Sequence, residues 1–175
     1  MSSLINNYSF FKGKKVCAFT GHRPHKLALL DKNYEELEVT VRKRLKHEIA
    51  KSILDGYSVF LCGMALGVDF WAAEEVLSLA KEKNILFYAV IPFAGHCDIW
   101  SKKDIQTYND IIKKCDNIFI VSDYPSRYAY LRRDKLLVDC CDRLIAVYNQ
   151  NIIGGTAYTV RYAQKCEKEI VEIKI

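Results

Sequence analysis

The sequence is poor in the residues that interrupt regular structure. Its 175 residues include only eight glycines and three prolines. It has no Gly-, Ser- or Pro-rich stretch that would indicate a linker, and no internal repeat that would indicate a solenoid or propeller. We therefore predict one domain over residues 1–175, since domains usually span roughly 100–200 residues.

Long apolar runs and paired cysteines are also missing. No run approaches the roughly 20 residues of a membrane helix, and the first residues do not resemble a signal peptide. The seven cysteines include no C-x-x-C pair, which argues against a disulfide framework or a zinc site. His22, His25, His96 and Cys97 lack a metal-ligand spacing, so we expect no metal. We predict a cytoplasmic protein that does not associate with membranes.

The composition indicates a globular protein with a substantial core. Half of the residues are hydrophobic and 27% are charged, which is far from the composition of a disordered chain. The net charge of +5 favours an anionic ligand, but it is too small to indicate nucleic-acid binding by itself.

Short apolar runs alternate with amphipathic stretches along the chain. For example, Leu37, Val41, Leu45, Ile49 and Ile53 recur every four residues and predict one face of a helix. We predict strands at 15–20, 57–61, 85–91, 118–121, 143–148 and 170–175, and helices at about 34–54, 67–83, 105–115, 127–140 and 155–167. Continuous apolar strands between helices are typical of a parallel sheet covered on both faces. The predicted fold is a Rossmann-like α/β three-layer sandwich, with a mostly parallel sheet flanked by helices.

The few glycines and prolines follow the predicted strands. After the first, second, third and fifth strands come, in order, Gly21 and Pro24, Gly63 and Gly67, Pro92, and Gly154 and Gly155. In a parallel sheet these positions share the carboxyl edge, where open α/β sheets bind ligands. Glycine lets a ligand approach the backbone, and the following helix N-termini suit phosphate. We predict a pocket for a phosphate-bearing, nucleotide-like ligand.

Polar side chains at this edge fit such a ligand. Arg23 offers a guanidinium fork for phosphate, and Thr156 offers a hydroxyl. Asp69 either accepts hydrogen bonds from ribose hydroxyls or supports the start of its helix. Arg132 or Arg133 is a further candidate for the pocket. A stacking wall for a base is one interpretation of three aromatic residues, Phe93, Trp100 and Tyr124.

These motifs together resemble the YpsA-like family of the SLOG superfamily, which groups the DNA-processing protein DprA with the LOG cytokinin-activating hydrolases. The similarity rests on residues 17–24 (CAFTGHRP), on the G-x-A-x-G-x-D-x-x-A pattern of 63–72, on Pro92-Phe93, and on residues 145–148 leading to 154–156. It implies a Rossmann-like fold that binds nucleotides or nucleotide-derived molecules, with members that act as sensors, sequestering proteins or hydrolases. The predicted ligand-binding residues are Gly21, His22, Arg23, Gly63, Met64, Gly67, Asp69, Pro92, Phe93, Arg133, Gly154, Gly155 and Thr156.

The chain departs from its relatives at two points. Related proteins commonly carry an Arg-Asn pair where this chain has Arg133-Asp134, and an aspartate cannot donate as an asparagine does. The LOG hydrolases place a catalytic glutamate shortly after their Gly-Gly-x-Gly-Thr motif. Here Thr156 is followed by Ala-Tyr-Thr-Val, so LOG-type hydrolysis does not transfer.

The leading hypothesis is a protein that binds a nucleotide derivative such as NAD or ADP-ribose, with no catalytic residue and no required cofactor. A nucleotide-processing N-glycosidase is the first alternative, with Asp69 or Glu74 as its acid or base. The second alternative, by analogy with DprA, is single-stranded nucleic-acid binding. It would use the arginines and tyrosines Arg23, Arg127, Arg132, Arg133, Tyr124, Tyr128 and Tyr130. The sequence leaves self-association into a homo-oligomer open.

Overall fold

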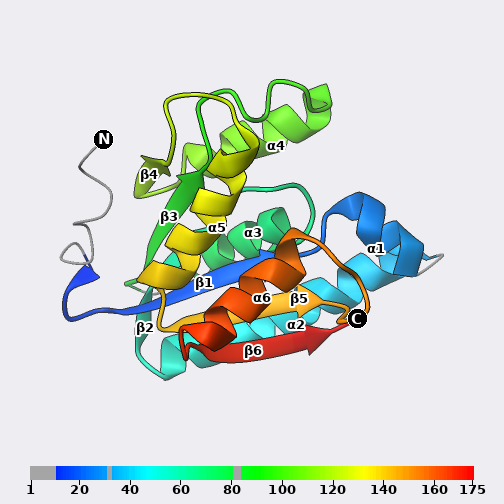
Figure 1. The fold of residues 1–175 in the computed structure, drawn as a ribbon. Helices are drawn as coiled ribbons and strands as arrows, with labels where there is room; N and C mark the ends of the chain where they lie inside the picture. Colours follow the sequence, from blue (N-terminus) through cyan, green and yellow to red (C-terminus); the bar gives the residue numbers. More distant parts are fainter. Residues whose placement is uncertain (1–10, 31–32, 81–83) are drawn as a thin grey trace.

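The computed structural model describes residues 11–30, 33–80 and 84–175 (Figure 1). Its centre is a single β-sheet. Its strands are β1 (Lys15–Gly21), β2 (Tyr57–Cys62), β3 (Leu86–Ile91), β4 (Asn117–Ile120), β5 (Arg143–Tyr148) and β6 (Glu169–Lys174). They form one sheet in the order β4-β3-β2-β1-β5-β6, and every neighbouring pair is parallel. The predicted α/β class and parallel sheet are therefore confirmed.

Helices cover both faces of this sheet. They are α1 (Pro24–Leu30), α2 (Tyr34–Leu54), α3 (Val68–Ala80), α4 (Lys102–Ile112), α5 (Arg127–Cys140) and α6 (Gly155–Lys165). Buried side chains of α1 to α4 join one apolar core, and those of α5 and α6 pack on the other face of the sheet. In Figure 1, α5 and α6 lie in front of the sheet, with α2 and α3 behind it. The result is the predicted three-layer sandwich.

The strand order places a topological switch point beside β1. The chain proceeds from β1 through β2 and β3 to β4, and α5 then returns it to β5 on the other side of β1. Because successive connections leave β1 and β5 toward opposite faces, a crevice opens at the carboxyl ends of these two strands. β1 itself is almost entirely buried, so it gives the crevice a rigid base.

The sequence did not predict α1, and it misplaced the start of α4. α1 has seven residues and a single buried side chain, Leu27, so it has too little periodicity to detect. α4 begins at Lys102 because the Ser101 side chain accepts a hydrogen bond from the amide of Asp104. The predicted helical residues 81–83 lie outside the described residues. No helix in the described part of the chain combines the length and apolar composition needed to cross a membrane.

Candidate functional site

A cavity of about 390 Å³ lies at the switch point. The end of β1, the loop after β2, one face of α5 and the first turn of α6 form its walls. A smaller cavity of about 50 Å³ adjoins it toward β3 and shares Arg23, Ala65, Tyr130 and Arg133 with it. The switch-point cavity is lined by six of the predicted residues: Gly21, Arg23, Asp69, Arg133, Gly155 and Thr156. The smaller cavity is lined by five of them: Arg23, Gly63, Met64, Pro92 and Arg133.

A larger cavity of about 480 Å³ lies elsewhere, between α3 and α4. Its lining includes Glu74, Ser78, Thr107 and Lys114, all from helices or their ends. No strand end or helix N-terminus converges on it. The candidate site is therefore the switch-point cavity, where strand ends, a helix N-terminus and a buried arginine meet.

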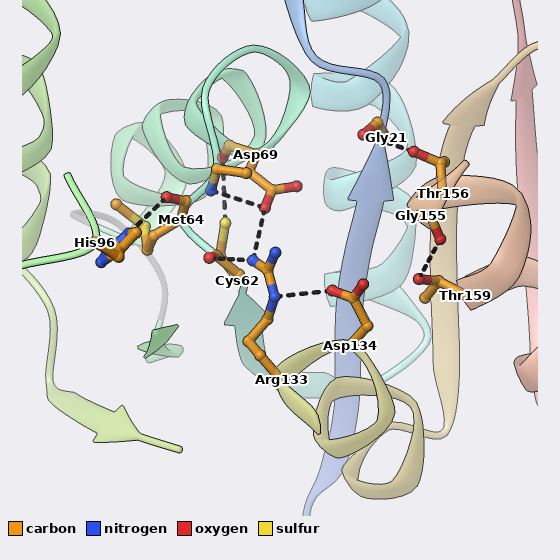
Figure 2. A network of polar contacts seen from close by, with 12 residues as sticks. Gly21, Cys62, Met64, Asp69, His96, Arg133, Asp134, Gly155, Thr156 and Thr159 are labelled. Atoms are coloured by element: carbon orange, nitrogen blue, oxygen red, sulfur yellow. Dashed lines mark hydrogen bonds and ion pairs between the residues drawn. The ribbon is translucent and has the colours of Figure 1, made fainter. Parts of the chain in front are cut away.

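Arg133 is the buried centre of this site. Its side chain is 7% exposed and lies between two carboxylates, those of Asp69 and Asp134 (Figure 2). Its Nη1 donates to the carbonyl of Gly63 and is 3.6 Å from Oδ2 of Asp69. Its Nε lies 2.8 Å from Oδ1 of Asp134, an ion pair that lacks the alignment of a hydrogen bond. These contacts compensate the charge that burial would otherwise penalise.

Both carboxylates that flank Arg133 are themselves largely buried. Oδ2 of Asp69 accepts a hydrogen bond from the amide of Ala65 at 3.0 Å and so holds the loop between β2 and α3. Burial raises the pKa of Asp69, and Arg133 opposes that rise. Burial also raises the pKa of Asp134, against the effects of Arg133 and Arg23. Asp69 thus supports the start of its helix while also lining the cavity.

The N-terminus of α6 opens into the cavity without a side-chain cap. Asn33, Ser101 and Ser126 cap α2, α4 and α5 through their side chains, whereas the N-cap of α6 is Gly154. The hydroxyl of Thr156 donates to the carbonyl of Gly21 at 2.9 Å, which ties α6 to the end of β1. Free amides and the helix dipole at such an end favour an anion.

Three of the glycines make room for protein atoms rather than for a ligand. A Cβ atom on Gly63 would meet the guanidinium of Arg133, and one on Gly21 would meet the side chain of Val68. Gly67 has φ +89°, and its Cβ would lie 2.9 Å from the carbonyl oxygen of His22. Among the predicted site glycines, only Gly155 has ordinary space, with Oδ2 of Asp134 as the nearest atom at 3.8 Å, since a Cβ atom on Gly154 would meet Nζ of Lys26. The predicted close approach of a ligand thus has room at Gly155.

His22 connects two strand ends and does not line either cavity. Its amide donates to the carbonyl of Val147 at 3.2 Å, and its Nε2 accepts from the amide of Asn149 at 3.1 Å. The ring proton is therefore on Nδ1. Burial lowers the pKa of His22, which favours this neutral form. The residue fixes the spacing of β1 and β5.

The loop after β2 and the residues after β3 form the smaller cavity. Met64 has φ 54°, and its carbonyl accepts from Nε2 of His96 at 3.3 Å. Phe93 lines neither cavity, but its ring packs edge-on against Tyr130, with centroids 5.6 Å apart. Trp100 lines the smaller cavity, whereas Tyr124 is 77% exposed and lines neither. The three aromatics considered as a stacking wall are therefore not brought together.

Several lining residues are absent from the predicted ligand-binding set, although Arg127 and Tyr130 were considered for nucleic-acid binding. Lys26 and Tyr130 line the switch-point cavity, and the Arg23 guanidinium lies 5.7 Å from the centroid of the Tyr130 ring. Arg127, Tyr130 and Asp134 also line it, at positions i, i+3 and i+7 of α5. That helical spacing was a readable signal, because such positions share one face. The described residues contain no group of three or more His, Cys, Asp or Glu placed to hold a metal ion.

Comparison with known proteins identifies the family of this chain. The YpsA model, described as the YspA SLOG family, matches residues 17–175. A UPF0398 protein of Lysinibacillus sphaericus (strain C3-41) is 27% identical over 149 residues, which cover 83% of this chain and 83% of that protein. A UPF0398 protein of Bacillus thuringiensis (strain Al Hakam) is 27% identical over 154 residues, covering 86% and 83%. These names state no activity and no ligand.

Proposed function

The chain belongs to the YpsA family of SLOG proteins, and from this premise we propose that it binds a phosphate-bearing, nucleotide-derived small molecule as a sensor or sequestering protein. One observation carries the proposal: the uncapped N-terminus of α6 and the cationic residues Arg23 and Lys26 border one cavity at the switch point. Such a combination of backbone amides and cations suits phosphate.

The cavity suggests an orientation for this ligand. Its phosphate would lie against the first turn of α6, Arg23 and Lys26. Its base would lie toward Tyr130, whose ring borders both cavities, since aromatic side chains stack on bases. NAD and ADP-ribose contain all of these parts and are suitable probes.

The carboxylates near the cavity support binding rather than chemistry. Asp69 and Asp134 both pair with Arg133, so neither is free to act as a general acid or base without losing a partner. Glu74 pairs with Arg42 at 2.7 Å and lines the cavity between α3 and α4 instead. We therefore expect no release of adenine or guanine when AMP or GMP is incubated with the protein.

Nucleic-acid binding is a second candidate, favoured by exposed tyrosines at the start of α5. Tyr124 and Tyr128 are 77% and 75% exposed and flank Arg127 in the sequence. Stacking residues beside a cation suit a single strand. Its binding constant would fall steeply with salt, whereas binding of a small molecule within the cavity would depend on salt only weakly.

Thermal unfolding with a panel of ligands tests the proposal. The panel comprises adenine and guanine nucleotides, NAD, ADP-ribose and cyclic dinucleotides. A ligand at about 100 times its Kd contributes about 2.7 kcal/mol, and each kcal/mol raises Tm by roughly 2–4 °C in a domain of this size. Arg23→Ala should reduce the shift, whereas Arg161→Ala, an exposed arginine on α6 outside both cavities, should not. A flat response to every compound would contradict the nucleotide proposal.

A further inference from the structure

The Asp134 carboxylate lies on the floor of the switch-point cavity, between Arg133 and the first turn of α6 (Figure 2). Its side chain is 16% exposed, and its Oδ1 is 2.8 Å from Nε of Arg133. Oδ2 faces α6, because a Cβ atom on Gly155 would lie 3.8 Å from it. One carboxylate oxygen therefore pairs with arginine and the other borders the space at the helix N-terminus.

This carboxylate retains hydrogen-bonding capacity toward the cavity. An ionised carboxylate has about four acceptor positions, and Arg133 approaches only the Oδ1 side. The hydroxyl of Thr159 lies within reach of Asp134, but it has a single proton and donates to the carbonyl of Gly155 at 2.9 Å, so it fills at most one of these positions. A ligand group that donates hydrogen bonds, such as a hydroxyl, is therefore favoured beside Asp134.

Charge is distributed unevenly between the floor and the rim. On the floor, the single positive charge of Arg133 lies between the two carboxylates of Asp69 and Asp134, so the floor is net negative when both carboxylates are ionised. Around it, the lining includes the cations Arg23, Lys26 and Arg127. A phosphate is repelled from the floor and attracted to the rim. The neutral, hydroxyl-bearing part of the ligand therefore occupies the floor beside Asp134. Its phosphate then extends away from the floor, toward the amides at the start of α6 and the cations of the rim.

We propose that Asp134 reads the ribose of the ligand by accepting hydrogen bonds from its vicinal 2′- and 3′-hydroxyls. This inference rests on the proposed function and deepens it by naming the ligand class: ribonucleotide derivatives whose 2′- and 3′-hydroxyls are both free. A 2′-deoxy ligand leaves a buried acceptor unfilled, and a 3′-phosphate places like charges together. Acidic residues recognise ribose in the same chemical manner in dinucleotide-binding sites.

Calorimetric titration with a matched pair of probes, ADP and 2′-deoxy-ADP, tests the inference. The wild-type protein should bind ADP at least about tenfold more tightly, because a site that hydrogen-bonds a hydroxyl discriminates against its absence. In Asp134→Ala the ratio of the two Kd values should fall to within about twofold, through weaker binding of ADP. Asp139→Asn is the matched control: it is on the same helix, lines a different cavity and should keep the wild-type ratio.

The isosteric variant Asp134→Asn keeps the test decisive if the alanine variant does not fold. Its amide oxygen still accepts, but it lacks the charge, so the ratio should fall at least about twofold. Equal binding of the two probes by the wild type, or an unchanged ratio in both Asp134 variants, overturns the role of Asp134 and leaves the proposed function standing. Failure of the wild type to bind either probe or any member of the nucleotide panel contradicts the proposed function and this inference together.

Discussion

Two buried arginines lie at opposite edges of the sheet, and their surroundings differ. Arg143, at the amino edge, pairs with Asp55 and Glu169 at 2.8 Å, donates to Oγ of Ser52 at 3.0 Å and lies over the Tyr57 ring. Its partner carboxylates are 39% and 50% exposed. Arg143 thus joins β5, β6 and the end of α2, and its charge is compensated by these structural contacts.

Arg133, near the carboxyl edge, also lies between two carboxylates, but these are only 8% and 16% exposed. The same three side chains line a cavity. The difference between the two edges is therefore the space beside the arginine and not the type of its partners. A buried, paired arginine indicates a ligand site only where it borders a cavity.

The largest expected effect is a loss of stability on substitution of Arg133, and it distinguishes the two edges of the sheet. Arg133→Met should lower the free energy of unfolding by about 3–5 kcal/mol at pH 7, because it leaves two buried carboxylates uncompensated. Since the pKa values of Asp69 and Asp134 are already raised, protonation should reduce this loss as the pH is lowered. Urea denaturation at pH 7 and pH 5 measures it. An equal loss at both pH values would contradict the pairing, and the variant should also lose binding of ADP-ribose.

At the amino edge, Arg143→Met should cost less, about 2–3 kcal/mol, and should not affect binding. Charge-assisted hydrogen bonds are lost, but the freed carboxylates are half exposed and regain water. Urea denaturation and titration with ADP-ribose check both parts. A loss of ligand affinity in the folded variant would break the distinction between a structural edge and a binding edge.

Two glycines at the carboxyl edge sharpen the comparison further. Gly67→Ala should destabilise by about 1–3 kcal/mol, because its φ of +89° and the nearby His22 carbonyl leave no room for a methyl group. Gly155→Ala should change stability by less than about 0.5 kcal/mol, yet it should weaken binding of ADP-ribose because its methyl group enters the cavity. Thermal unfolding and calorimetry of the pair measure this. A stable Gly67→Ala, or unchanged affinity in Gly155→Ala, would contradict the assignment.

The smallest expected effect is in the dependence of stability on pH. Hydrogen bonding by Arg143 lowers the pKa of Glu169, so this residue stabilises the fold above about pH 4.3, its unfolded pKa, and less as the pH falls through its folded pKa. Burial raises the pKa of Asp134. Its contribution is therefore complete below about pH 3.9 and is lost as the pH rises through its folded pKa.

The corresponding variants should change opposite parts of the pH profile. Glu169→Gln should reduce the loss of stability on acidification below about pH 4, and Asp134→Asn should reduce the loss of stability as the pH rises toward 7. Urea denaturation at a series of pH values from 3 to 7 distinguishes them. Profiles of the same shape in both variants would show that the two edges do not titrate differently.

The sequence was sufficient to predict the sheet, but it was insufficient to predict the roles of individual residues at the candidate site. Strands such as β5 were predicted with the observed bounds, because buried strands are continuous apolar runs. The roles of Gly21 and Gly63 were not predictable, because the atoms that approach them belong to Val68 and Arg133. The uncapped start of α6 was readable from Gly154-Gly155, since neither residue has a side chain to cap it.

The missed residues have a similar explanation. Lys26 was overlooked because α1 was not recognised as a helix, and its position in the cavity depends on that helix. The predicted Arg23 and Thr156 do reach the cavity, although the hydroxyl of Thr156 is donated to the carbonyl of Gly21. Contacts between distant segments decide these details of Lys26 and Thr156, whereas the shared helix face of Arg127, Tyr130 and Asp134 was readable from their spacing.

The most direct measurement is an amide NMR titration of the ¹⁵N-labelled protein with ADP-ribose. The largest chemical-shift changes are expected at the uncapped amides of Gly155 and Thr156 and at Nε of Arg133, which border the switch-point cavity. Residues of the larger cavity between α3 and α4, such as Ser78 and Lys114, should not respond. Saturable changes centred on that cavity, or none at the start of α6, would contradict the central claim that the carboxyl edge of the sheet is the binding site.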